Sequence, residues 1–94
     1  MKNYLVEILF CGEDFPMHTI IEAKDKNDLY KKVNVLYFMG YDNVDEYEED
    51  KGQPYSNLDP QECLDDMLAI SCEDILLYIM DLESRKVIFD YTED

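Results

Sequence analysis

The feature that most constrains the fold is a change in hydrophobic spacing along the chain. Segments 4–11 and 17–24 are rich in β-branched, aromatic and aliphatic residues, a composition typical of strands. The segment 12–16 between them contains glycine and proline, so the two strands are predicted to form a hairpin with a five-residue loop. The alternating residues of the first strand, expected on one face of a sheet, are Tyr4, Val6, Ile8 and Phe10.

Between residues 25 and 40 the spacing becomes helical. Asp25 or Asn27 can cap the start of this helix, and Gly40 can take the left-handed conformation after its end. One apolar stripe along the helix is formed by Leu29, Val33, Leu36 and Tyr37. Three more apolar residues point away from that stripe and predict a second apolar face, which something else must cover. They are Val35, Phe38 and Met39.

A second helix is predicted from Pro60 to about Ile70. Three signals mark its start: an acid at the cap position, Asp59, a proline at the first helical position, and Glu62 three residues after the cap. The residues expected to face the core are Cys63, Met67 and Ile70. Those expected together on the opposite face are Glu62, Asp65 and Asp66.

The stretch 41–57, between the two predicted helices, shows no sustained hydrophobic spacing and includes Gly52 and Pro54. It is predicted to be a long surface loop, acidic over 42–57, with at most a short strand or turn. Loops of this length are usually functional or mobile.

Residues 75–82 fit either a strand or a third helix, because 71–74 could form a capping box. A strand is favoured, since a tight turn at 83–86 would create an apolar face from the cross-strand pairs Leu82–Val87, Met80–Phe89 and Tyr78–Tyr91. The predicted order is therefore ββααββ. It corresponds to a single α+β domain over 1–94, with an antiparallel sheet of about four strands and two helices packed on one face.

The net charge restricts the partners that the protein can have. The chain carries 23 Asp and Glu against 8 Lys and Arg, a formal charge of −15. Nucleic acids and anionic membranes would repel such a protein, so direct binding to either is not expected. The N-terminal apolar stretch is broken by Glu7 and is too short for a signal peptide, which predicts a cytoplasmic protein, or one in the host cytoplasm if it is phage-encoded.

The charge is concentrated in one block. Residues 1–41 and 84–94 each have a net charge of −1, whereas residues 42–83 have −13. Carboxylates two apart on an extended chain lie roughly 6–7 Å apart, and those three or four apart on a helix about 5–6 Å, a spacing comparable to that of phosphates. Tyr41, Tyr47 and Tyr55 lie among the acids and could stack on arginine. The candidate partner-binding residues are Asp42, Asp45, Glu46, Tyr47, Glu48, Glu49, Asp50, Glu62, Asp65 and Asp66.

These features predict a non-enzymatic acidic inhibitor or interaction protein whose carboxylates mimic nucleic acid in front of a basic, nucleic-acid-binding enzyme. In size and charge the chain resembles the small acidic proteins that phages and mobile elements use against restriction or CRISPR effectors. That resemblance is one of composition and implies a DNA mimic with anti-CRISPR or anti-restriction activity. The competing interpretation of the acidic block is an ordinary solvated face.

An alternative function depends on apolar surface instead of charge. The second face of the first helix, Val35, Phe38 and Met39, would then be an interface of a small interaction domain. Such a domain could be an adaptor, an immunity protein for a basic toxin, or one subunit of a homodimer. The other expectation for this face is that the 41–57 loop folds over it.

Neither catalysis nor cofactor binding is predicted. His18 is the only histidine and lies in a predicted strand, no nucleophile motif or phosphate-binding glycine loop is present, and no cofactor is expected. The acidic stretch does not fit an EF-hand, because a glycine at its sixth position, Gly52, would place Lys51 at position five. No metal site is therefore predicted, and loose cation binding stays an alternative. Cys11, Cys63 and Cys72 are expected to be buried, reduced thiols.

Overall fold

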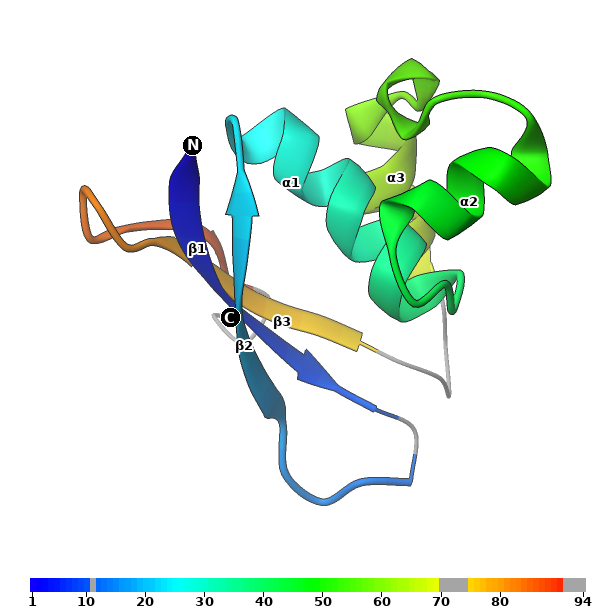
Figure 1. Cartoon of the computed structure of the whole chain (residues 1–94). Helices are drawn as coiled ribbons and strands as arrows, with labels where there is room; N and C mark the ends of the chain where they lie inside the picture. Colours follow the sequence, from blue (N-terminus) through cyan, green and yellow to red (C-terminus); the bar gives the residue numbers. More distant parts are fainter. Residues whose placement is uncertain (11, 70–74, 91–94) are drawn as a thin grey trace.

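A computed structural model describes residues 1–10, 12–69 and 75–90 of the chain (Figure 1). It is an α+β domain in which two hairpins flank a helical segment, as the predicted order required. The elements are β1 (Lys2–Leu9), β2 (Met17–Ala23), α1 (Lys26–Val33), the π-helical turn η1 (Asn34–Phe38), α2 (Val44–Lys51), the 3-10 turn η2 (Tyr55–Asn57), α3 (Pro60–Ala69), β3 (Ile75–Asp81) and β4 (Lys86–Asp90).

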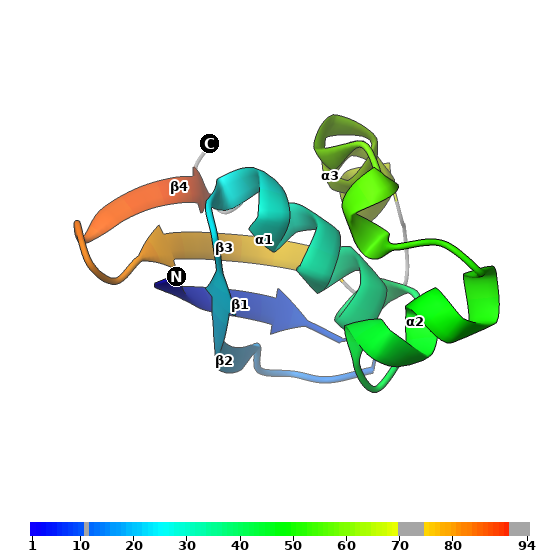
Figure 2. The same ribbon diagram turned by 45° about the horizontal axis from the view of Figure 1, so that its top comes forward.

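The four strands form one antiparallel sheet in the order β2-β1-β3-β4. Each hairpin pairs strands that are neighbours in sequence, and the long-range pairing of β1 with β3 joins the two hairpins. The helices all lie on one side of this sheet (Figure 2). The fold class and the one-sided helical layer are as predicted, with α2 as an additional helix.

The core lies between the sheet and α1 and α3. Tyr4, Val6 and Ile8 of β1 are buried, which confirms the predicted alternation, and Phe10 packs against the same core from its edge. The helices contribute Leu29, Val33, Cys63 and Met67, all of them buried. Full burial of an aliphatic or aromatic side chain stabilises the fold by about 1.5–3 kcal/mol.

The first helix begins and ends at the predicted residues but changes type on the way. The Asp25 side chain accepts a hydrogen bond from the Asp28 N–H at 2.9 Å, and Gly40 adopts the left-handed φ of +87°. After Val33 the backbone widens into the π-helical η1, in which the Met39 N–H donates to the Asn34 carbonyl at 2.7 Å. π-helical turns are rare and occur mostly as single turns next to α-helices.

The predicted second apolar face of this helix is largely part of the protein's own core. Val35 is fully buried, and Phe38 is half-buried against the core cluster. Both α2 and α3 contact η1 and cover it. Only Met39 stays exposed, at 42% of its surface. The proposed apolar interface of Val35, Phe38 and Met39 is therefore a wrong prediction, because the segment that follows the helix packs over it.

The prediction of a long loop over 41–57 is also wrong, because the helix α2 occupies its centre. The Asn43 side chain caps the helix by accepting from the Glu46 N–H at 2.8 Å. At the other end Gly52 is left-handed, with φ +69°, and its N–H donates to the Glu48 carbonyl. Tyr47 is the one buried residue of α2, so the helix has no apolar stripe from which a helical period could be read.

The predicted start of α3 is confirmed. The Asp59 carboxylate accepts from the Gln61 N–H at 2.9 Å, and the Asp59 carbonyl accepts from the Cys63 N–H at 2.9 Å. Cys63 and Met67 face the core as expected. Ile70, which was also predicted to do so, lies outside the described residues.

The strand assignment of β3 is confirmed, although the predicted register of β3 with β4 is wrong. The observed partners are Asp81↔Lys86, Met80↔Val87, Ile79↔Phe89 and Tyr78↔Asp90, with a shift between Ile79 and Met80. Tyr91 lies outside the described residues. The register of β3 with β1 shifts as well, between Glu7 and Ile8. These shifts are typical of β-bulges, which change the face that each following residue occupies.

The consequence is that β3 turns a different set of residues towards the helices. Leu76, Ile79 and Asp81 are buried, whereas Tyr78 and Met80, two residues of the predicted apolar face, are only half-buried. Their strand partners Glu7, Leu5 and Val87 are likewise not buried. Tyr78 and Met80 therefore belong to the sheet face opposite the helices.

Candidate functional site

Most of the acids of the 42–83 block that the structure describes lie on two helices and the turns around them. Five of the eight residues of α2 are acids, and a single base, Lys51, lies in its last turn. Asp42 is exposed just before this helix, and Asp45 and Glu46 occupy its first turn. Acids in a first turn stabilise a helix through its dipole, so these two have a structural role as well as a charge.

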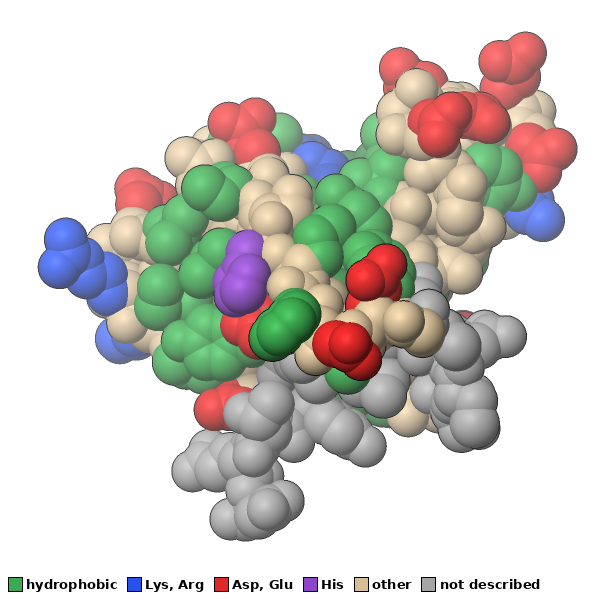
Figure 3. Space-filling view, turned by 90° about the horizontal axis from the view of Figure 1, so that it is seen from below, with side chains coloured by type: hydrophobic (Ala, Val, Ile, Leu, Met, Phe, Trp, Pro, Cys, Tyr) green, Lys and Arg blue, Asp and Glu red, His purple; other side chains and the backbone are tan. Residues whose placement is uncertain are grey.

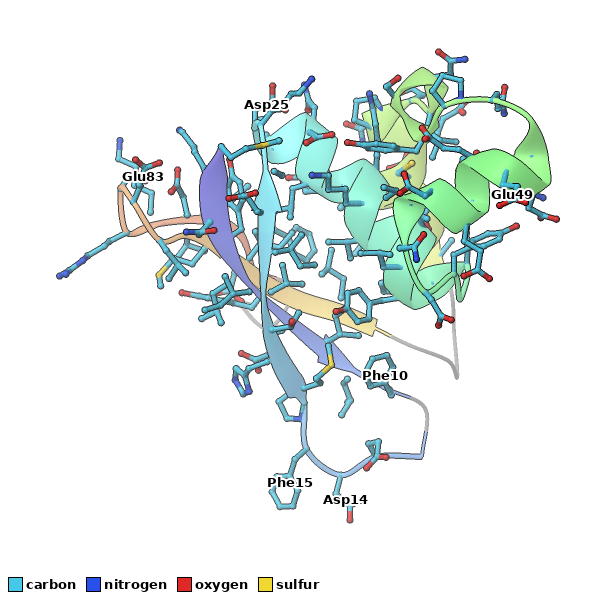
Figure 4. All side chains as sticks on the ribbon, viewed as in Figure 1. Phe10, Asp14, Phe15, Asp25, Glu49 and Glu83 are labelled. Carbon is cyan, nitrogen blue, oxygen red and sulfur yellow. The ribbon has the colours of Figure 1, made fainter. Side chains whose placement is uncertain are left out.

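An open hollow of about 550 Å³ lies beside α2 and brings three of the predicted acids together. Its lining consists of Tyr41, Glu46, Glu49 and Asp50. Glu46, Glu49 and Asp50 are spaced i, i+3, i+4, which places them on one face of the helix. Glu49 extends from α2 on the side away from the sheet (Figure 4).

Tyr41 closes one side of this hollow. Its hydroxyl donates a hydrogen bond to the Asp50 carboxylate at 2.6 Å, and this bond raises the pKa of the tyrosine. The ring of Tyr41 meets that of Tyr47 edge to face, with centroids 5.4 Å apart. Tyr41 is half-buried, so part of the ring remains accessible to a partner.

Tyr47 does not belong to the binding surface, contrary to the prediction. It is only 2% exposed and is the residue through which α2 packs onto the domain. An aromatic ring in that position cannot stack on the guanidinium group of a partner. Its role is to fix α2 in place.

Glu48 likewise makes its contact within the protein and not with a partner. It is half-buried, and its carboxylate accepts a hydrogen bond from the Tyr55 N–H at 2.8 Å. The Tyr55 hydroxyl in turn donates to the Asp28 carboxylate at 2.7 Å. Burial, and then the bond to Asp28, raise the pKa of Tyr55 strongly. Tyr55 therefore links α1 to α2 and is not a stacking platform for a partner.

Asp28 is the residue at this site that the sequence did not indicate. Besides the Tyr55 hydroxyl, its carboxylate accepts the Lys24 N–H at 2.9 Å and lies 3.5 Å from the Lys32 ammonium. Burial acts to raise the pKa of Asp28, but the two hydrogen bonds and the charge of Lys32 outweigh it, and the pKa lies below the usual value. Asp28 and Tyr55 are 27 residues apart, so no local pattern predicts their contact.

The second acidic row lies on α3, as predicted. Glu62, Asp65 and Asp66 are exposed and repeat the i, i+3, i+4 spacing of the first row. Asp65 accepts a hydrogen bond from the Gln61 side chain at 3.0 Å. No basic residue lies in the last turn of α3. The two rows are on separate helices of the same layer, with α2 in front of α3 in Figure 1.

Both helices place like charges at a spacing that disfavours helix formation. The i, i+4 pairs are Asp45–Glu49, Glu46–Asp50 and Glu62–Asp66. Each such pair destabilises an isolated helix by about 0.2–0.5 kcal/mol. Glu49 and Asp50 also lie near the C-terminus of α2, where the helix dipole disfavours negative charge. The stability of α2 itself therefore does not explain Glu49 and Asp50, although Asp50 also accepts the hydrogen bond from Tyr41.

The remaining candidate residues give no sign of catalytic or metal chemistry. His18 is exposed on β2, with its Nε2 atom 3.2 Å from the Glu7 carboxylate. Within residues 1–10, 12–69 and 75–90, no group of three His, Cys, Asp or Glu side chains is placed to hold a metal ion. Cys63 is a buried free thiol whose pKa is raised by burial, and Cys11 and Cys72 lie outside the described residues.

Comparison of the chain with protein-family models, with curated proteins and with solved structures finds no significant match. Among the helices in the described part of the chain, none has the length and apolar character needed to cross a membrane.

Proposed function

We propose that this protein is a non-enzymatic acidic inhibitor that presents helix carboxylates to a basic, nucleic-acid-binding protein. The observation that carries the proposal is the arrangement of like charges on α2 and α3. Two exposed triplets, Glu46/Glu49/Asp50 and Glu62/Asp65/Asp66, have the same spacing, and each contains an i, i+4 pair of like charges that costs helix stability. A surface retained at such a cost is expected to serve binding.

Binding would follow the electrostatics of nucleic-acid recognition with the charges of the two sides exchanged. Opposite potentials accelerate the encounter, and arginine or lysine side chains of the partner then form charge-assisted hydrogen bonds with the carboxylates. The hollow beside Tyr41 offers three carboxylates around one space, which suits the insertion of a basic side chain. The bound partner could no longer hold nucleic acid in the same groove. Anti-CRISPR and anti-restriction activity are the specific forms of this proposal.

The competing explanation is that the acids form an ordinary solvated face. Some of the acids have a structural role in the fold, and others do not. Asp45 and Asp59 support helix starts, and Glu48 holds Tyr55. Glu49, Asp50, Asp65 and Asp66 have no helix-start role, and they are exposed. We therefore assign partner binding to these four residues first, with Asp42, Glu46 and Glu62 beside them.

The first experiment is affinity capture from a nuclease-treated bacterial lysate at low salt, followed by elution with duplex DNA and then with high salt. We expect a DNA- or RNA-binding protein to be retained and to be released by DNA, because DNA competes for the same basic groove. Elution by both treatments would support mimicry. If no retained protein binds nucleic acid, or DNA releases none of them, the proposal fails.

Two matched variants test the site itself. The helix-acid variant carries Glu49→Gln, Asp50→Asn, Asp65→Asn and Asp66→Asn. The control variant removes the same number of charges from exposed acids outside α2 and α3: Glu13→Gln, Asp14→Asn, Glu22→Gln and Glu83→Gln. Because both variants change the net charge equally, any difference between them reports the location of the charge and not its amount.

A further inference from the structure

One face of the sheet is free of helices over the described residues. Packing of α1 and α3 against Val6, Ile8 and Ile21 covers the other face, so residues that alternate with these point the opposite way. Antiparallel sheets commonly leave one face to solvent, and that face is then usually polar. Here it is not.

Four apolar residues form a continuous row across this face. Leu5 pairs with Ile20 on one side and with Met80 on the other, and Met80 pairs with Val87. The row therefore crosses the sheet from β2 to β4. Ile20 is 63% exposed and Val87 51% exposed. Hydrophobic side chains gather beside the single histidine in the view of Figure 3, which looks at the molecule from below.

A second hydrophobic feature lies next to the sheet. Phe15, in the β1–β2 loop, is 82% exposed and points away from the body of the protein (Figure 4). Six large hydrophobic side chains of the described residues are exposed, and Phe15, Ile20 and Val87 are three of them. An exposed apolar row such as the one across the sheet is typical of an interaction site.

We infer that this open sheet face pairs with the same face of a second copy of the chain. The charge distribution favours this partner, because the acid triplets lie on α2 and α3, in the layer on the other side of the sheet. Face-to-face packing of two sheets would leave both acidic layers at the outside of the dimer. Self-association through a helical face would instead bring the acids together.

The face is also complementary to itself. A two-fold axis along the apolar row sets each residue of the row against its own copy. The same rotation sets Glu22 of one copy near His18 of the other, and Asn3 near Glu7, because these residues flank the row on its two sides in the strand register. Packed sheets keep their strands within about 30° of each other, so these approximate neighbours are retained.

The size of the face predicts a weak dimer. Strands about 4.8 Å apart, rising about 3.4 Å per residue, make the face of the four strands about 19 Å wide and about 24 Å long. The two copies together would bury about 900 Å², below the roughly 1,200 Å² of a standard stable interface. We therefore expect a dissociation constant between micromolar and millimolar.

The test is sedimentation equilibrium of the full chain from micromolar to millimolar concentration, at low and at high salt. Ile20→Lys and Val87→Lys change the proposed interface, and Met39→Lys is the control, since Met39 is an exposed apolar residue in the helical layer. All three make the same change in net charge. Circular dichroism checks that each variant is folded.

We expect the wild-type protein and Met39→Lys to dimerise alike, and the other two variants to dimerise at least about tenfold more weakly, because a lysine would be buried in the apolar row. A wild-type monomer at every concentration would overturn the inference. So would dimerisation of Ile20→Lys and Val87→Lys at the wild-type strength, or its loss in Met39→Lys.

The salt dependence keeps this inference separate from the proposed inhibitory function. Salt screens the repulsion between two chains of charge −15, so the dimer should strengthen as salt rises. Binding to a basic partner should weaken under the same change. A dimer that weakens with salt would contradict an apolar interface, whatever the result of partner capture.

Discussion

At the scale of single residues, Tyr55 connects parts of the chain that are distant in sequence. Its N–H donates to the Glu48 carboxylate, and its hydroxyl donates to that of Asp28. Through these bonds the turn after α2 is attached to the start of α1. The acids of α2 owe part of their fixed position to this residue, which itself carries no charge at neutral pH.

Replacing Tyr55 by phenylalanine tests this connection. The variant keeps the ring but removes the hydroxyl that donates a hydrogen bond to the half-buried Asp28 carboxylate. The free energy of unfolding should fall by about 1.5–3 kcal/mol, as for other hydrogen bonds to charged groups. Urea unfolding measures the change. Tyr41→Phe is the matched control. The Tyr41 hydroxyl also donates to a carboxylate, but this carboxylate belongs to Asp50, which is exposed. Equal losses in the two variants would contradict the role given to Tyr55.

Asp81 predicts a pH dependence of stability. Burial acts to raise its pKa, but the N–H groups of Glu83 and Ser84 and the charge of Lys2 outweigh burial and hold the pKa below its usual value. A carboxyl whose pKa is lower in the folded state adds stability above the unfolded pKa and loses it as pH falls through the folded pKa.

We therefore expect Asp81→Asn to be less stable than the wild-type protein at neutral pH, and expect the difference to shrink as the pH falls below about 4. Urea unfolding at neutral pH and at low pH gives both differences. A difference that stays constant with pH would show that the aspartate acts through packing and not through its charge.

At the scale of elements, local signals predicted the two hairpins and the caps of two helices. Asp25 and Asp59 cap as expected because a cap depends on residues within one turn. The same reasoning could have found α2, where Asn43 and Gly52 are good start and stop signals. The hydrophobic spacing did not indicate α2, because Tyr47 is its one buried residue and a helix without an apolar stripe has no hydrophobic period.

The register of β3 shows a different limit. Its pairings shift once against β1 and once against β4, and each shift moves residues to the other face of the sheet. Alternation along one strand cannot reveal such a shift, because it is set by the neighbouring strands. For this reason Met80 pairs with Val87 and not with Phe89, and Tyr78 pairs with Asp90.

The helix-acid variant has an expected effect on the fold as well as on binding. Its substitutions interrupt the repulsive pairs Asp45–Glu49, Glu46–Asp50 and Glu62–Asp66. Its free energy of unfolding should therefore rise by about 0.5–1 kcal/mol at low salt. The increase should diminish at high salt, where repulsion is screened. Urea unfolding at the two salt concentrations measures it. A loss of stability would indicate that these acids support the fold.

At the scale of the whole molecule, the structure separates charge from apolar surface. The segments that build β1, β2 and β4 have little net charge, while the block of −13 supplies α2, α3, their turns and β3. The sequence located this block correctly, but it included Tyr47 and Glu48, which the fold uses internally. Burial is a tertiary property, so the subset of acids available to a partner could be identified only from the structure.

The central claim is that the location of the helix carboxylates, and not the total charge, creates the binding surface. The most direct measurement is the dissociation constant of the captured nucleic-acid-binding partner for the wild-type protein, the helix-acid variant and the control variant at one salt concentration. We predict a loss of affinity of at least about fourfold in the helix-acid variant, because four weakened charge contacts of about 0.2–1 kcal/mol each sum to roughly 0.8–4 kcal/mol, and much less in the control variant. Equal affinities for the two variants would contradict the claim.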